Sequence, residues 1–317
     1  NDEEDEEEDE DEEDEDDTRA ANIWIEIPNG AAVFGKRLGP LMVAVGDGCR
    51  WVVAAPEEGN SRGQITMFQN DTELMRIVGK AQGDQLGKAI TMSRDGLVMA
   101  VGAPYHSPYE IENAGQVTIY EWVNIEEEEE IIATPDDEDD DDIDDDFREK
   151  PWSVRGRTLN GMGPYDNLGS SVALNGDGTI VATGSPKSDT NGRNSGTVQV
   201  FRWDALEQEY LPFGQAITGV QVGEQFGLAV SLSRDGKILA ASGTTMEYRV
   251  RTQRPGFVRV YRYSKRMKQW KPLGTSLLGR NIKDSFGDDL VLSSSGSRLV
   301  VGAGSPGNGY VRVYDLK

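Results

Sequence analysis

The sequence predicts an all-β fold, a five-bladed β-propeller with four antiparallel strands in each blade. Three observations lead to this prediction: five copies of one sequence repeat, an alternation of apolar residues within each copy, and an orphan strand before the first copy. The 37 glycines and 13 prolines among 317 residues suit a fold with many turns.

The repeat opens with Leu-Gly or Phe-Gly and ends with a Gly-x-Val-x-Val-Tyr type of strand. The opening glycine falls at positions 39, 87, 169, 227 and 287, so successive copies lie 48, 82, 58 and 60 residues apart. The 82-residue interval contains an acidic insert. The remaining intervals are slightly longer than the blades of common propellers.

The first two strands of a blade are clearest in the fourth copy. Val230 and Leu232 alternate with serines, which predicts a strand. Asp235-Gly236 predicts a tight hairpin turn, and residues 238–241 predict a second, mostly buried strand.

The third and fourth strands follow in the same copy. Val258 and Val260 are predicted to face one side of the third strand and Arg259 and Tyr261 the other. A looser fourth strand is predicted over residues 270–279. Its counterparts are residues 152–161 and 210–219, and the third-strand valines correspond to Val117 and Ile119, Val198 and Val200, and Val311 and Val313.

The ends of the repeat array predict that the ring closes. The last copy stops after its third strand, whereas residues 23–30 read as a fourth strand placed before the first copy. If residues 23–28 pair beside residues 310–314, the last blade is complete and no sheet edge stays open. The alternative is a fragment of a larger ring, in which Trp24 ends a missing blade.

Two segments carry most of the negative charge. Residues 2–17 are all Asp or Glu, and residues 126–146 contain 15 more acids, so 25 of the 56 acids remain against 32 basic residues. The net charge of −24 therefore divides into two acidic segments and a body near +7. Such charge density with few apolar residues predicts disorder.

These observations predict a disordered acidic tail (1–21), a propeller (22–317) and a disordered acidic insert (123–150) within the second blade. No apolar run is long enough to span a membrane, and no signal peptide is visible. The lone Cys49 leaves the redox compartment open. The sequon at Asn70 carries little weight, because one such triplet is expected by chance.

The repeat resembles the FG-GAP repeats of integrin-alpha-type propellers, and more closely those of microbial and algal extracellular propellers. Residues 101–104 (Val-Gly-Ala-Pro), 301–303 (Val-Gly-Ala) and 284–287 (Asp-Ser-Phe-Gly) carry the resemblance, which covers residues 22–317 apart from the insert. Residues 233–236 and 311–315 also resemble WD-repeat hairpins. The resemblance implies a propeller used as an interaction platform, secreted or at the cell surface.

The sequence departs from the calcium loops found in many integrin-type blades. Residues 93–96, 175–178 and 233–236 each offer one acid, whereas calcium takes six to eight oxygen ligands. We therefore expect tight hairpin turns at these places and no bound metal or cofactor.

A search for catalytic residues favours a non-enzymatic protein. The single histidine, His106, is expected to be an exposed loop residue. A glycosidase would need two carboxylates facing each other across a cavity. The candidates are four acids, each two residues before an opening Leu-Gly or Phe-Gly pair; Lys36 takes this position in the first copy. We expect these acids to cap turns. The alternative is that they form a functional ring of carboxylates. They are Asp84, Asp166, Glu224 and Asp284.

A basic stretch supplies the second set of candidate binding residues. Its cations are interleaved with aromatic residues, a pattern seen in nucleic-acid sites. The acidic load of the chain opposes phosphate, so nucleic acid is not the expected partner. There are two other interpretations: the cations lie on the solvent-exposed face of outer strands, or they contact the acidic segments of the same chain. The cations are Arg249, Arg251, Arg254, Arg259, Arg262, Lys265, Arg266, Lys268 and Lys271.

The sequence therefore predicts a monomeric, adhesion-like interaction module that binds a protein or glycan ligand on its loop face. One alternative is an intracellular scaffold or acidic chaperone for basic proteins. Another is a carbohydrate-binding or glycosidase-like propeller. A basic protein or weakly held calcium at the acidic segments completes the set of expected partners.

Overall fold

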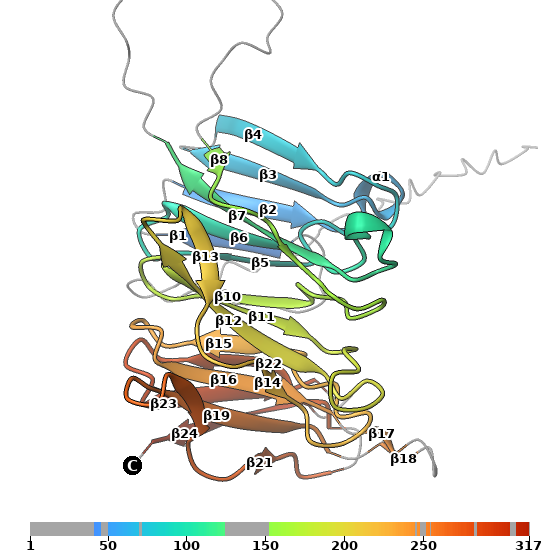
Figure 1. Ribbon diagram of the computed structural model, residues 1–317, viewed down its shortest axis with the longest axis vertical. Coiled ribbons are helices and arrows are strands. Elements are labelled where there is room, and N and C mark those ends of the chain that lie inside the picture. Colours follow the sequence, from blue (N-terminus) through green and yellow to red (C-terminus); the bar gives the residue numbers. More distant parts are fainter. Residues whose placement is uncertain are drawn as a thin grey trace, which may run out of the picture.

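The computed structural model describes residues 41–45, 50–69, 72–123, 152–244, 246–247, 252–253, 255–281, 284–304 and 309–316. Within these residues the chain is almost wholly β-structure, with one short helix, α1 (Glu58–Ser61), and one 3-10 turn, Pro108–Glu110. The strands form five antiparallel sheets of three to five strands, with sheet 1 at the top of Figure 1 and sheets 4 and 5 together at the bottom. The predicted all-β class is confirmed.

Each sheet is built from consecutive strands. Sheet 1 contains β1 (Leu41–Val45), β2 (Arg50–Ala55), β3 (Gln64–Gln69) and β4 (Thr72–Val78). Sheet 2 contains β5 (Ala89–Met92), β6 (Val98–Ala103), β7 (Gln116–Trp122), β8 (Trp152–Val154) and β9 (Leu159–Asn160). Sheet 3 contains β10 (Ser171–Leu174), β11 (Ile180–Ser185), β12 (Thr197–Asp204), β13 (Glu209–Pro212) and β14 (Ile217–Thr218).

The last two sheets follow the same order. Sheet 4 contains β15 (Val230–Leu232), β16 (Ile238–Gly243), β19 (Phe257–Ser264), β20 (Gln269–Pro272) and β21 (Leu277–Leu278). Sheet 5 contains β22 (Phe286–Leu292), β23 (Arg298–Ala303) and β24 (Tyr310–Asp315). A small ribbon of β17 (Met246–Glu247) and β18 (Thr252–Gln253) leaves sheet 4 between β16 and β19.

The predicted fourth strand is split into two pieces in sheets 2, 3 and 4. In sheet 4, β20 and β21 both pair with β19, and Gly274 between them has a φ of +79°. This left-handed conformation favours glycine and interrupts the strand. The looser pattern of this strand in the sequence therefore has a backbone cause.

The core lies between sheets. We call the side of a sheet that faces the next sheet in chain order its front face, and the opposite side its back face. Val198 and Val200 on the front of sheet 3 pack against Leu239 and Tyr261 on the back of sheet 4. The same front-to-back packing joins sheets 1 and 2, 2 and 3, and 4 and 5. Burying each such aliphatic side chain contributes about 1.5–3 kcal/mol.

The innermost strands differ from simple alternation. In β15, Ser231 is buried together with Val230 and Leu232, because sheets lie on both sides of the strand. The Ser231 hydroxyl accepts a hydrogen bond from the Leu292 amide of sheet 5 at 3.0 Å. The serine is thus satisfied by the neighbouring sheet and does not face solvent.

Backbone hydrogen bonds also link the hairpin turns of successive sheets. The amide of Arg94 donates to the carbonyl of Gly176 (3.0 Å), the amide of Gly176 to Arg234 (2.9 Å), and the amide of Arg234 to Ser294 (2.9 Å). These bonds, one at each interface between sheets 2 and 5, align the hairpin turns of successive sheets on the same side of the molecule.

Sheet 5 ends the stack with an open front face. Val311 and Val313 occupy the positions of Val198 and Val200, yet they are 66% and 58% exposed, against 0% and 4%. Among the described residues no strand pairing joins sheet 5 to sheet 1, and β24 is the edge of a three-stranded sheet. The predicted ring closure is therefore not confirmed. The strand predicted at residues 23–28 lies outside the described residues, as does most of the insert 123–150.

The open face makes a prediction about stability. Val311→Asp should change the free energy of unfolding by no more than about 0.5 kcal/mol, because the carboxylate stays in water. Val198→Asp, its matched control, buries an unpaired charge and should cost more than about 3 kcal/mol. Urea unfolding of both variants measures the difference. A large loss in Val311→Asp would mean that the face is covered, as a closed ring requires.

Candidate interaction surfaces

The strands run between two rims of the molecule. One, the loop rim, carries the connections between second and third strands and between successive sheets. Those that the structure describes include residues 56–63, 79–86, 104–115, 161–168, 186–196, 219–226, 279–281 and 284–285. The other, the hairpin rim, carries the turns at residues 93–97, 175–179, 205–208, 233–237, 265–268 and 293–297.

The four predicted acids lie on the loop rim, and each closes its own loop. The carboxylate of Asp84 accepts the amide of Ala81 at 2.8 Å, and Asp166 accepts that of Gly163 at 3.0 Å. The carboxylate of Glu224 accepts the amide of Val220 at 2.7 Å. Asp284 accepts the amides of Arg280 and Asn281 at 2.8 and 2.7 Å. This geometry is the turn capping that the sequence favoured.

Each acid also has a side-chain partner. Glu224 forms two hydrogen bonds with the Arg259 guanidinium, at 2.9 and 3.1 Å, and the guanidinium lies over the Phe257 ring. Asp284 accepts the Tyr310 hydroxyl at 2.7 Å. That hydroxyl and the two amides hold the pKa of Asp284 below its usual value, although burial opposes them.

The other two acids, Asp84 and Asp166, contact side chains of the loops that follow the second strands β6 and β11. Asp84 lies 3.0 Å from Nδ1 of His106. The Ser188 hydroxyl hydrogen-bonds to Asp166, but burial outweighs it and raises the pKa of this carboxyl. His106 is only 16% exposed at its side chain, so its prediction as an exposed loop residue was wrong. The contact with Asp84 holds the imidazole against the neighbouring loop, residues 79–86.

The loop rim also exposes apolar side chains that the sequence analysis missed. Tyr109 and Met162 are 82% and 84% exposed, and Tyr165, Val220 and Val222 are also exposed. They are scattered through polar loops in the sequence, so no periodic pattern marks them. Only the fold brings their loops to one rim.

Contacts between the loops that carry these residues link the loop rims of sheets 2 and 3. The amide of Tyr165 donates to the Glu112 carbonyl at 2.7 Å, and the amide of Gly223 donates to the Arg193 carbonyl at 2.9 Å. The Lys187 ammonium lies 5.7 Å from the centre of the Tyr105 ring and bridges the two sheets. We call Tyr109, Met162, Tyr165, Val220 and Val222 the loop-rim patch.

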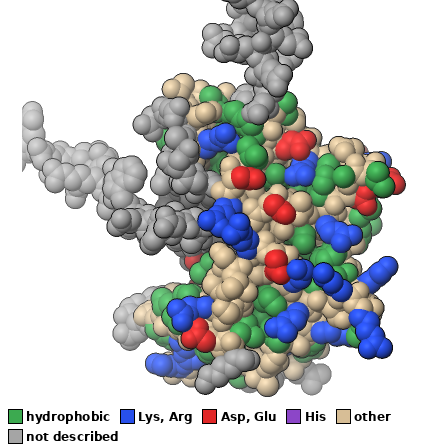
Figure 2. Space-filling model, turned by 90° about the vertical axis from the view of Figure 1, so that its left-hand side faces the viewer, with side chains coloured by type: hydrophobic (Ala, Val, Ile, Leu, Met, Phe, Trp, Pro, Cys, Tyr) green, Lys and Arg blue, Asp and Glu red, His purple; other side chains and the backbone are tan. Residues whose placement is uncertain are grey.

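Of the predicted basic residues that the structure describes, Arg259 pairs with Glu224 on the loop rim, whereas the cations of the β19–β20 turn lie apart from the four acids. Arg262, Lys265 and Arg266 are exposed at the hairpin rim of sheet 4, opposite the loop rim. Figure 2 shows the hairpin rim, where Lys and Arg side chains gather at the lower right. Arg249, Arg251 and Arg254 lie outside the described residues, as do Lys36, Cys49 and Asn70.

The Asp-Gly turns on the hairpin rim are capped turns, as the sequence favoured. Asp95, Asp177 and Asp235 each accept the amide two residues later at 3.0 Å. The following glycines have φ values of +66° to +70°, as tight turns require. Among the described residues no group of three potential ligands could hold a metal ion.

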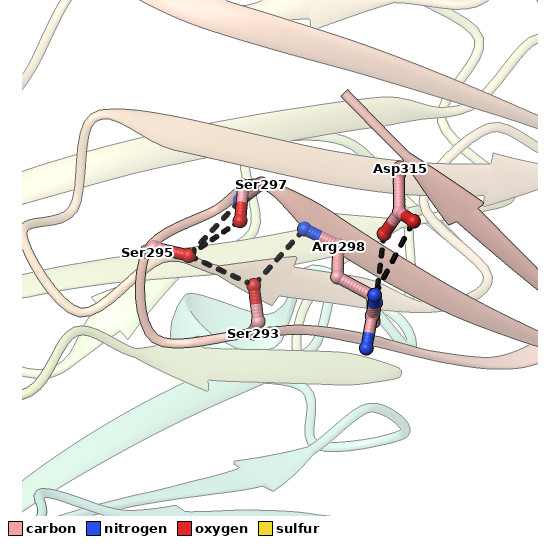
Figure 3. Close-up of polar contacts among 5 residues, drawn as sticks. All are labelled: Ser293, Ser295, Ser297, Arg298 and Asp315. Atoms are coloured by element: carbon pink, nitrogen blue, oxygen red, sulfur yellow. Dashed lines mark hydrogen bonds and ion pairs between the residues drawn. The ribbon is translucent and has the colours of Figure 1, made fainter. Parts of the chain in front are cut away.

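Sheet 5 builds the same turn from serines (Figure 3). The Ser295 hydroxyl accepts the Ser297 amide at 3.3 Å, and the Ser293 hydroxyl accepts the Arg298 amide at 3.0 Å. The Arg298 guanidinium pairs with Asp315 at 2.7 Å beside the turn. Capping therefore needs an oxygen at this position and not a carboxylate.

Comparison with known proteins supports the repeat identified in the sequence. Residues 159–201, from β9 into β12, match the model of the FG-GAP repeat, which confirms the resemblance for this stretch. A search of curated proteins finds no match. The described residues contain no helix long and apolar enough to cross a membrane.

Two solved structures are similar in fold. Hydrazine synthase of Kuenenia stuttgartiensis aligns with a TM-score of 0.52 and 14% identity, over 92% of this chain and 67% of its own. A putative 6-phosphogluconolactonase from Bacteroides fragilis gives a TM-score of 0.49 and 15% identity, over 86% of this chain and 69% of its own. The likeness to hydrazine synthase concerns the fold alone and supports a propeller-like arrangement of sheets.

The capped turns predict an acid-sensitive stability. Burial raises the pKa of Asp177 and of Asp235, but hydrogen bonds from Thr179 and from Ser233 and Lys237 lower both overall. Their contribution is present above the unfolded-state pKa of about 3.9 and is lost as pH falls through the lower folded value. The double variant Asp177→Asn and Asp235→Asn should therefore lose less unfolding free energy between pH ~5 and ~2 than the parent. Denaturant titrations at several pH values measure the unfolding free energy. If it falls equally with pH in the parent and in the double variant, the two carboxylates do not have this role.

Proposed function

We propose that the chain is a non-catalytic interaction module that binds a protein ligand through the loop-rim patch, outside the cell or at the cell surface. The observation that carries the proposal is the exposure of Tyr109, Met162, Tyr165, Val220 and Val222 on one rim. Exposed apolar surface framed by polar residues marks interaction sites more often than chance.

The loops that present this patch are held in fixed conformations. Four residues before the opening Leu or Phe have φ between +46° and +56°, which costs free energy unless the surroundings enforce it. The capping acids and the loop-to-loop hydrogen bonds supply that support. A preformed surface loses little entropy on binding, which favours affinity. The four residues are Gln85, Asn167, Gln225 and Ser285.

The composition of the patch favours a protein ligand over a glycan. Met162, Val220 and Val222 are aliphatic and offer no hydrogen bond to a sugar hydroxyl, whereas flexible Met side chains adapt to varied apolar partners. Tyr109 and Tyr165 add large, rigid contact area of the kind that dominates protein interfaces. The extracellular location rests on the resemblance to FG-GAP repeats.

The same geometry argues against a glycosidase. Hydrolysis needs one carboxylic acid and one carboxylate free to reach the sugar. Asp84, Asp166, Glu224 and Asp284 instead accept the amides of their own loops and contact four different partners. The acidic segments enter the proposal only as accessories that keep the module soluble.

The triple variant Tyr109→Ala, Met162→Ala and Val222→Ala tests the proposal. The triple variant should fail to capture the proteins that the parent chain captures from an extracellular fraction. For an identified partner, its dissociation constant should be at least ~10-fold higher than that of the parent. Binding should change little between ~50 and ~300 mM salt, because desolvated contacts are weakly screened.

The matched control changes exposed apolar residues on the other rim. Leu206→Ala and Met267→Ala remove similar side chains from the hairpin turns. These substitutions should leave capture unchanged. Capture that survives the loop-rim substitutions, or that disappears in the hairpin-rim control, would refute the assignment of the ligand to the loop rim.

A further inference from the structure

The hairpin of β19 and β20 carries an unusual concentration of positive charge. The chain has eleven Lys or Arg residues and no Asp or Glu between residues 248 and 283. Five of these cations lie on or next to the β19–β20 turn, and all five are exposed. We call them the basic hairpin: Arg262, Lys265, Arg266, Lys268 and Lys271.

The basic hairpin lacks local charge compensation. In the part of the chain that the structure describes, none of its five cations forms an ion pair. Arg262 and Lys271 are paired directly across the two strands. Like charges directly opposite each other on paired strands destabilise a hairpin. An anion bound between them would remove that repulsion.

The fold itself does not require these charges. The β12–β13 hairpin of sheet 3 has the same register, the same four-residue turn and the same left-handed last turn residue (φ +54° at Gln208, +52° at Lys268). That hairpin carries Asp204, Glu207 and Glu209 against a single cation, Arg202. Two hairpins of the same shape thus have opposite charge, so the cations of sheet 4 serve something other than folding.

The aromatic residues of the hairpin point away from the rim. Trp270 is 1% exposed and its indole N–H donates to the Phe213 carbonyl at 2.8 Å. Tyr263 stacks on the Phe213 ring with centroids 3.9 Å apart. Neither ring is free to stack on a base, which removes the platform that single-stranded nucleic acids need. The ligand must be an anion recognised by charge without stacking.

We infer that the basic hairpin binds an extended sulfated polysaccharide. The cations lie on two paired strands and on the turn that joins them, all exposed, so a chain of repeated anionic groups can contact several of them at once. Sulfate esters remain charged at all physiological pH values and accept hydrogen bonds from both guanidinium and ammonium groups. The site lies on the rim opposite the loop-rim patch, so it would add a second ligand independent of the first.

The test measures binding of a heparin oligosaccharide of defined length to the full chain at ~150 mM salt, where the ~8 Å screening length weakens the influence of distant acidic segments. The triple reversal Lys265→Glu, Arg266→Glu and Lys268→Glu should raise the dissociation constant at least ~10-fold. The control Lys80→Glu, Lys88→Glu and Arg94→Glu makes the same change in net charge on exposed residues elsewhere and should raise it less than ~3-fold.

A second variant tests sufficiency. Placing the cations on the sheet 3 turn (Ala205→Lys, Leu206→Arg and Gln208→Lys) in the triple-reversal background should restore part of the binding. Equal weakening by the reversal and the control would mean that net charge alone acts, and would overturn the proposal. So would competition by a single-stranded oligonucleotide at the same concentration of anionic groups. Loss of protein capture by the loop-rim variant leaves this outcome unaffected.

Discussion

The close approach of successive sheets at a small residue is the constraint on which the rest of the structure depends. An added Cβ at Gly184, in the second strand of sheet 3, would overlap the carbonyl oxygen of Gly227, which opens sheet 4. Gly227 itself has a φ of +96° and lies against the Cα of Gly184. The glycine of the Leu-Gly or Phe-Gly pair therefore serves packing between sheets as well as a turn. The same contact recurs between Gly102 and Gly169.

This contact fixes where the loops and the hairpin turns lie. Because sheets 2 to 5 each begin against the second strand of the sheet before, the described loops that precede their first strands emerge on one rim, and the Asp-Gly turns of sheets 2 to 4 emerge on the other. A rigid stack then presents loops whose side chains need not contribute to the core. The acids that first suggest a catalytic ring instead hold these loops in shape. The two rims differ in character: the loop rim exposes five apolar side chains over sheets 2 and 3, and the hairpin rim exposes the cations of the β19–β20 turn.

The sequence predicted the strands well because their signals are local. The hairpin at Asp235-Gly236, the alternation at Val258 and Val260, and the looser fourth strand can all be recognised within one repeat, whereas the division of that strand into β20 and β21 was not predicted. The loop-rim patch could not be predicted from the sequence, because Tyr109 and Val222 are 113 positions apart and share no sequence pattern. Nor could the burial of His106, because its contact with Asp84 depends on the packing of two loops. Ring closure is not confirmed for a related reason: it depends on how much the series of sheets curves, and small rotations at each interface decide that.

Substitution of two equivalent glycines tests the packing constraint most directly. In Gly184→Ala the new methyl group meets the backbone of Gly227, which cannot move aside without separating sheets 3 and 4, so the free energy of unfolding should fall by several kcal/mol. In Gly302→Ala, at the same position of sheet 5, the nearest atom is the Asp289 carbonyl oxygen at 3.6 Å, and the change should stay within about 0.5 kcal/mol. A near-neutral Gly184→Ala, measured by urea unfolding of both variants, would contradict the account.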